Sequence, residues 1–143
     1  MRLLLTALIL IAVPLAAQTP NPCTLLTNAQ VTAAMGTPMT STPGPPVSCI
    51  WNARNGDSRV YVTLRDAAAY ATAKSQATAV DKLIPISGLG DGAFILGDPD
   101  TPGALYVLKG SHTVVILAHA TDFTPDQTQA AEKTLAAQIL SHL

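Results

Sequence analysis

The sequence predicts a single α+β domain, an antiparallel sheet of two hairpins packed with helices as a two- or three-layer sandwich. Segments 50–65 and 104–118 predict the hairpins, because each contains two apolar runs joined by a glycine-containing turn. Thr27, Asp66 and Thr124 predict the helices, because each begins a helix-start pattern. The order of helix, two strands, helix, strands and helix is typical of a sheet layered with helices.

Residues 1–17 have the three parts of a signal peptide: a basic start, an apolar run and a small-residue end at Ala17. A transmembrane anchor is the alternative, but a spanning helix needs about 20 apolar residues and this run is interrupted by Pro14. We expect cleavage after Ala17, which leaves residues 18–143 as the mature domain. Such a protein would be periplasmic or secreted, with no stable membrane anchor after the signal is removed.

The charge balance excludes two classes of partner. The chain has 8 Lys and Arg residues against 9 Asp and Glu residues, for a formal net charge of −1. Arg2 would leave with the signal peptide, which makes the mature domain more acidic. We therefore expect no basic surface for nucleic acid and no polybasic segment for anionic lipid.

Cys23 and Cys49 are the only cysteines, and in an oxidising compartment they predict one disulfide. A lipoprotein is one alternative, but an acylated cysteine directly follows the cleavage site, whereas Cys23 lies behind Thr19-Pro20-Asn21-Pro22. A metal site is the other alternative. The two cysteines lack the paired spacing and the additional ligands of a zinc site, so we expect none.

The first predicted helix begins at Thr27, which forms a capping box with Gln30, and ends at Gly36. The following segment, 37–47, is rich in proline and predicts an exposed loop that can hold neither a helix nor a central strand. A Pro-rich recognition element is the alternative for this segment, but it lacks flanking charges.

The first hairpin is predicted from strands 50–54 and 58–65, which flank the turn sequence Asn55-Gly56-Asp57. Trp51 shares a strand face with Cys49, so we expect it to pack beside the disulfide. A role as a ligand platform is the alternative.

Asp66 is expected to cap an alanine-rich helix that runs to about Val80. The helix contains few large apolar side chains, so it should pack closely but thinly against the sheet and remain partly exposed. The glycine-rich stretch 88–92 follows it. Its glycine spacing does not match a phosphate-binding loop and no helix comes after it, so we expect a bend between an edge strand and strand 93–96.

Residues 97–103 have the composition of a turn. Strands 104–108 and 113–118 form the second predicted hairpin, and residues 113–117 are apolar on both faces, which predicts a central strand covered on both sides or nearly so. A last helix should begin at Thr124, with a capping box and Pro at its first position. Its residues Ala131, Leu135 and Ile139 recur at helical spacing and are expected to face the sheet.

The chain resembles a family of small exported bacterial envelope proteins, often lipoproteins, that is classed as a domain of unknown function. The similar pieces are Pro22-Cys23-Thr24-Leu25-Leu26-Thr27, Gly36, Ser48-Cys49-Ile50-Trp51 and Gly88-Leu89-Gly90-Asp91-Gly92-Ala93. The resemblance spans most of the mature chain, although the lipobox of the lipidated members is missing. It implies an envelope location, a paired Cys23 and Cys49, and no established activity. A looser similarity links the predicted fold to the PsbP and Mog1 type of α/β sandwich.

No local catalytic or cofactor motif is present in the sequence, and no metal site is predicted. His112 and His119 are an odd number of residues apart on one predicted strand, so they point to opposite faces. Glu132, the only glutamate, is expected on a solvated helix face. A triad assembled from distant residues stays open, because triads are defined by geometry rather than by sequence order.

These observations favour a non-catalytic binding or interaction module of the cell envelope, whose partner is an unknown apolar ligand or an envelope protein. The thin helix after Asp66 can leave a gap above the sheet that admits such a ligand. Close packing with no gap is the alternative. Trp51, Tyr70 and Phe94 are the candidate binding residues, because buried aromatic side chains dominate binding energies. The second hypothesis is a small hydrolase-like envelope enzyme with an unrecognised site.

Overall fold

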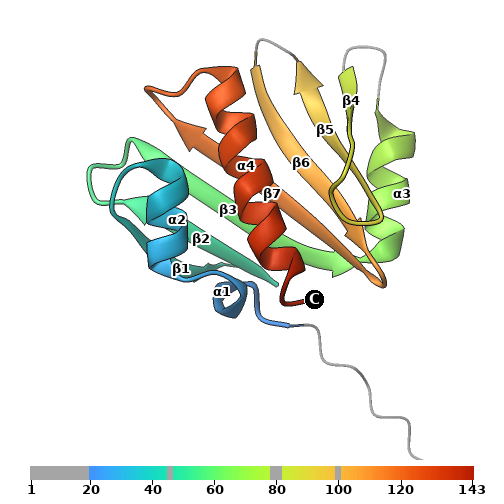
Figure 1. The fold of residues 1–143 in the computed structure, drawn as a ribbon, viewed down its shortest axis with the longest axis horizontal. Coiled ribbons are helices and arrows are strands. Elements are labelled where there is room, and N and C mark those ends of the chain that lie inside the picture. Colours follow the sequence, from blue (N-terminus) through green and yellow to red (C-terminus); the bar gives the residue numbers. More distant parts are fainter. Residues whose placement is uncertain (1–19, 45–46, 78–81, 99–100) are drawn as a thin grey trace, which may run out of the picture.

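A computed structural model describes residues 20–44, 47–77, 82–98 and 101–143. Within them the chain forms a seven-stranded antiparallel sheet and four helices (Figure 1), so the predicted α+β class is confirmed. The predicted signal peptide, residues 1–17, lies outside the described residues, as do residues 78–81 at the end of the predicted alanine-rich helix. Among the described residues, no helix is long and apolar enough to cross a membrane.

The sheet has the strand order β1-β2-β3-β7-β6-β5-β4, and both predicted hairpins, β2–β3 and β6–β7, are present in it. The long pairing of β3 with β7 joins the two hairpins. The elements are α1 (Pro22–Leu25), α2 (Asn28–Met35), β1 (Met39–Gly44), β2 (Ser48–Ala53), β3 (Ser58–Asp66), α3 (Ala67–Gln76), β4 (Lys82–Ile86), β5 (Gly92–Asp98), β6 (Thr101–Lys109), β7 (His112–Ala120) and α4 (Pro125–Leu140).

The prediction of an exposed loop over residues 37–47 is wrong for residues 39–44, which form a strand. Strand β1 pairs with β2 along its whole length, from Met39 opposite Ala53 to Gly44 opposite Ser48. This strand tolerates Pro43 because it lies at the edge of the sheet, where a missing N–H can face solvent. Strand β4 forms the other edge, as predicted, and contains Pro85. A proline on each edge strand disfavours the addition of a further strand.

Helices α2 and α4 cover one face of the sheet, which holds the main core. Strand β3 points Val60, Val62 and Leu64 toward this face, and all three are fully buried. From α4, Leu135 and Ile139 are also fully buried, as the helical spacing predicts. Each such side chain contributes about 1.5 to 3 kcal/mol through the removal of apolar surface from water.

The predicted helix caps are confirmed. The Thr27 hydroxyl accepts a hydrogen bond from the Gln30 N–H at 3.2 Å, and the Thr27 N–H donates to Gln30 Oε1 at 2.8 Å. Gly36 ends that helix in the left-handed conformation at φ 68°, which glycine adopts without strain. Thr124 forms the same capping box at the start of α4, with Pro125 at the first helical position.

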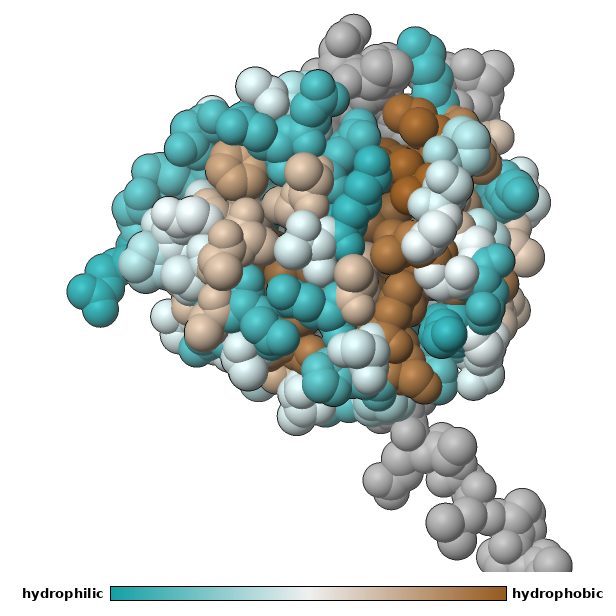
Figure 2. Space-filling view, viewed as in Figure 1, coloured by the Kyte–Doolittle hydropathy of each residue, from teal (hydrophilic) through white to brown (hydrophobic). Residues whose placement is uncertain are grey.

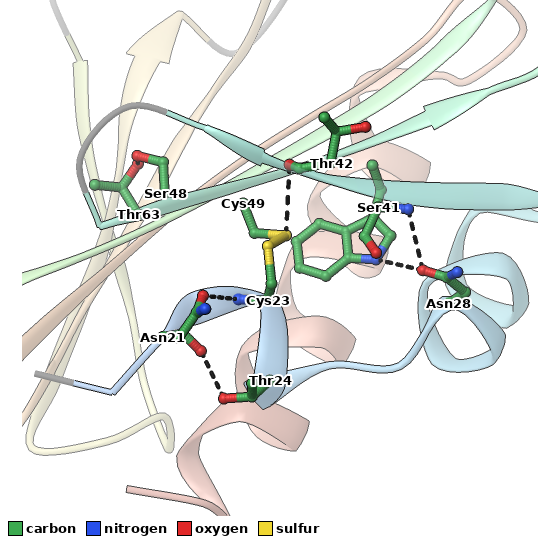
Figure 3. Close-up of a disulfide and its surroundings, with 10 residues drawn as sticks. Asn21, Cys23, Thr24, Asn28, Ser41, Thr42, Ser48, Cys49 and Thr63 are labelled. Carbon is green, nitrogen blue, oxygen red and sulfur yellow. Dashed lines mark hydrogen bonds between the residues drawn. A yellow bond between two sulfur atoms is a disulfide. The ribbon is translucent and has the colours of Figure 1, made fainter.

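The predicted disulfide joins Cys23 of α1 to Cys49 of β2, with the two Cα atoms 5.0 Å apart (Figure 3). Trp51 lies on the same face of β2 as Cys49 and is fully buried. Its Nε1–H donates to Asn28 Oδ1 at 3.2 Å, and the Ser41 N–H donates to the same oxygen at 3.1 Å. The disulfide indicates an oxidising, extracytoplasmic compartment.

The glycine-rich stretch forms the predicted bend between β4 and β5. The Asp91 N–H donates to the Leu108 carbonyl at 2.8 Å, and Asp91 Oδ2 accepts from the Gly110 N–H at 2.7 Å. A Cβ atom at Gly90 would clash with the Leu108 carbonyl oxygen and lie 2.8 Å from Val107 Cγ1. Glycine is therefore required where the bend meets the β6–β7 hairpin.

Candidate functional site

Helix α3 lies on the face of the sheet opposite α4, against strands β6, β7 and β3. It has no fully buried residue, which agrees with the predicted thin packing. It covers only part of this face, so Leu117 of β7 is 39% exposed. Strand β7 is central as predicted, but its coverage on this side is incomplete.

A hollow of about 480 Å³ lies between α3 and the sheet, and we call it the α3 groove. Its helical wall consists mainly of small side chains that recur along one face of α3. Its floor is formed by side chains from the neighbouring strands β3, β7, β6 and β5. The wall residues are Ala68, Ala69, Thr72, Ala73 and Gln76, and the floor residues are Thr63, Leu96, Tyr106 and Val115.

Aromatic packing holds α3 above the sheet. The Tyr70 ring lies 4.9 Å from the Phe94 ring, and the Phe94 ring stacks on Tyr106 at 5.0 Å, both measured between ring centroids. The Tyr70 hydroxyl also sits over Gly92, where an added Cβ would lie 2.9 Å from it. Burial raises the pKa of Tyr70. Tyr70 is the one aromatic side chain of α3 and acts as a spacer between the helix and the sheet, whereas the groove is lined on the helix side mainly by short alanine and threonine side chains.

The structure brings together two of the three candidate binding residues. Tyr70 and Phe94 are in contact, and Phe94 is 1% exposed beneath Tyr70, but neither side chain lines the α3 groove. Trp51 has no exposed surface and lies on the opposite face of the sheet, so it is not part of this site. Tyr106, which sequence reasoning missed, lines the groove. The sequence pattern that indicates its position is the alternation of strand 104–108. Because Leu105 and Val107 point to the core, Tyr106 points to the opposite face of the sheet.

The groove has a charged end, formed by Arg65 and Asp66 where β3 runs into α3. Asp66 Oδ1 accepts a hydrogen bond from the Ala69 N–H at 3.1 Å and thus caps α3. The Arg65 side chain is exposed. A second hollow of about 540 Å³ adjoins this end and shares Arg65, Asp66 and Ala69 with the groove, while Ser111 and His112 lie on its far side.

The prediction that Glu132 lies on a solvated helix face is wrong. Its side chain is fully buried between α4 and the sheet, and Oε1 accepts a hydrogen bond from the Ala118 N–H at 2.9 Å. The second oxygen, Oε2, has no hydrogen-bond partner among the described residues. Burial raises the pKa of Glu132 to about 8, against the opposing effect of the bond from Ala118.

The position of Glu132 follows from the strand pairing. Strand β6 pairs with β7 from Lys109–His112 up to Leu105–Ile116, so Ala118 lies beyond the region paired with β6. Its N–H binds the Glu132 carboxyl instead of a strand. Helical spacing from Leu135 and Ile139 also places residue 132 on the buried side of α4. The Glu132 side chain is thus enclosed in the main core, on the opposite side of the sheet from the α3 groove.

Within the described ranges, no group of three or more His, Cys, Asp or Glu side chains is placed to hold a metal ion. His112 borders the second hollow, whereas His119 lies opposite Arg59 near the other end of β7. The two histidines therefore occupy different parts of the molecule.

The face that carries α4 has an apolar stripe between α4 and β4 (Figure 2). Partly buried apolar side chains of β4 and the bend after it, Ile84, Ile86 and Leu89, pack against the core in this region. The stripe is the principal competitor to the α3 groove as an apolar binding surface.

No protein-family model, no curated protein and no solved structure matches this chain.

Proposed function

We propose that this protein is a non-catalytic binding module of the cell envelope, periplasmic or secreted, that holds an apolar ligand in the α3 groove. The observation that carries the proposal is the hollow of about 480 Å³ between a helix of small side chains and the sheet. This volume lies in the usual range of ligand sites, about 300 to 1,000 Å³. Such sites combine apolar walls with polar groups at defined positions. The groove has alanines, Leu96 and Val115 in its lining together with Thr63, Thr72, Gln76 and the charged end.

Two features favour a bound ligand over the other hypotheses. The prolines of both edge strands, Pro43 and Pro85, disfavour a protein partner that adds a strand to the sheet. The carboxyl of Glu132, whose pKa is strongly raised, lies across the sheet from the groove, so it cannot act on a molecule held there. We assign Tyr70 and Phe94 to shaping the groove and Tyr106 to contacting the ligand.

The remaining expectations are part of the same proposal. The resemblance to small exported envelope proteins supports the envelope location, and the residues 1–17 pattern supports export. Helices on both faces of an antiparallel sheet are compatible with a sandwich of the PsbP and Mog1 type, which we retain as a proposal about the fold.

Filling the groove should weaken the binding of a neutral apolar probe. Ala73→Leu places a larger side chain in the groove wall, whereas Ala71→Leu makes the same change at an exposed position of α3 outside the lining. In fluorescence titrations with N-phenyl-1-naphthylamine, we expect Ala73→Leu to weaken binding at least about tenfold, which corresponds to about 1.4 kcal/mol. Ala71→Leu should bind like the wild type.

Two results would contradict the proposal. One is a wild-type protein that gives no saturable fluorescence increase with the probe. The other is equal binding by Ala73→Leu and Ala71→Leu, which would place the probe elsewhere on the molecule. Thermal unfolding of both variants establishes that each is folded before binding is compared.

A further inference from the structure

We infer that the ligand of the α3 groove is a single-chain amphiphile with a carboxylate head group, whose alkyl chain lies along α3 and whose carboxylate binds Arg65. This inference deepens the proposed function and depends on it. It follows from the shape of the groove, from the chemistry of its walls and from the location of its charge.

The groove runs along α3 rather than into the protein. Its wall residues on α3 extend from Ala68 to Gln76 and lie on one helical face. At a rise of 1.5 Å per residue this span is about 12 Å long. The walls offer alanine methyl groups and Thr72 on the helix side, and Val115, Leu96, Thr63 and the Tyr106 ring on the sheet side. An elongated apolar group such as an alkyl chain matches this form better than a compact one.

The charge of the groove is confined to one end. Among the lining residues only Arg65 and Asp66 are charged, and both lie at the N-terminal end of α3, while Gln76 marks the other end. Asp66 is already engaged as the helix cap, where the positive end of the helix dipole compensates its carboxylate. The guanidinium of Arg65 has no comparable partner among the described residues, since no hydrogen bond or ion pair involves it there.

An arginine at one end of a groove that has alkyl side chains along its walls fits a carboxylate. The planar guanidinium can donate two parallel hydrogen bonds to the two carboxylate oxygens, which is a pairing stronger than that between neutral groups. The adjoining hollow gives a head group access to water and to Ser111 and His112 at the same end. The alkyl chain would then extend from Arg65 toward Gln76, along the alanine side chains of α3.

The test compares dodecanoate with dodecan-1-ol, each displacing N-phenyl-1-naphthylamine at pH 7 and below the concentration at which micelles form. We expect the wild type to bind dodecanoate about tenfold more tightly than the alcohol, because a hydrogen bond to a charged group is worth more than one to a neutral group. Arg65→Gln should remove this difference by weakening only dodecanoate binding. Arg59→Gln removes the same charge from the same strand and face, outside the groove lining, and should leave the difference in place.

The outcomes separate the two proposals. If the probe binds in the groove, as judged by Ala73→Leu, but the acid and the alcohol bind equally, the carboxylate inference is wrong and the proposed function stands. If Arg65→Gln and Arg59→Gln weaken dodecanoate equally, the effect is one of net charge and the assignment to Arg65 is wrong. If Ala73→Leu has no effect on any of the three compounds, the proposed function itself is wrong.

Discussion

The free energy of unfolding should fall by on the order of 4 to 5 kcal/mol between pH 4.5 and pH 9 because of Glu132 alone, and Glu132→Gln should remove this loss. The pKa of Glu132 is raised from 4.5 to about 8 in the folded protein. Between these two values the folded state holds a proton that the unfolded state has released. The stability contribution is therefore fully present below about pH 4.5 and is lost as the pH rises through about 8.

The physical cause is the burial of a carboxyl group without a cationic partner. When Glu132 ionises, its charge is compensated by one hydrogen bond, from the Ala118 N–H. The amide that replaces the carboxyl in Glu132→Gln keeps the shape and the acceptor oxygen but carries no charge. We therefore expect this variant to be more stable than the wild type at pH 9 and of similar stability at pH 4.5.

Urea unfolding of the wild type, Glu132→Gln and Asp126→Asn over this pH range measures the effect. Asp126 is an exposed carboxyl of the same helix, so its variant controls for the change in net charge. The wild type and Asp126→Asn should lose stability in parallel. Parallel curves for the wild type and Glu132→Gln would show that Glu132 is not the titrating group.

Loss of the disulfide should lower the free energy of unfolding by roughly 2 to 5 kcal/mol while the fold is retained. The bond ties the four-residue helix α1 to β2 and closes a loop that contains α2 and β1. The loop is also held by buried side chains of α2, Val31 and Met35, and by the bond between Trp51 and Asn28. These contacts do not depend on Cys23.

Chemical unfolding of Cys23→Ser, Cys49→Ser and the wild type with and without reductant tests this result. The fluorescence of Trp51, the only tryptophan, reports whether its buried environment persists. A double variant that carries both Cys23→Ser and Cys49→Ser should be insensitive to reductant. Two titratable thiols in the unreduced, denatured wild type would contradict the account.

Local signals in the sequence predicted the helix starts correctly, because a capping box such as Thr27–Gln30 or Thr124–Gln127 is formed by residues close in the chain. The same holds for the β2–β3 turn. Strand β1 was missed because its pairing with β2 is a tertiary contact, and the prolines that argue against a central strand do not exclude an edge. Glu132 was misplaced because its residue type was given more weight than its spacing from Leu135.

The candidate site was predictable in part. The alanine content of residues 67–77 predicts a thin helix, and a gap beneath it follows from the size of the side chains. The set of residues that line the groove depends on the register of β3, β7 and β6, and no local sequence pattern reveals this register. For this reason Tyr106 and Arg65 were not identified, and Trp51 was grouped with Phe94 although the sheet separates them.

A map of the amide and methyl NMR shifts on adding dodecanoate shows whether the ligand lies in the α3 groove. We expect the largest shifts at Ala69, Ala73 and Val115, which line the groove. Shifts concentrated instead at Ile84, Ile86 and Leu89 would place the ligand on the apolar stripe beside α4 (Figure 2) and contradict the account.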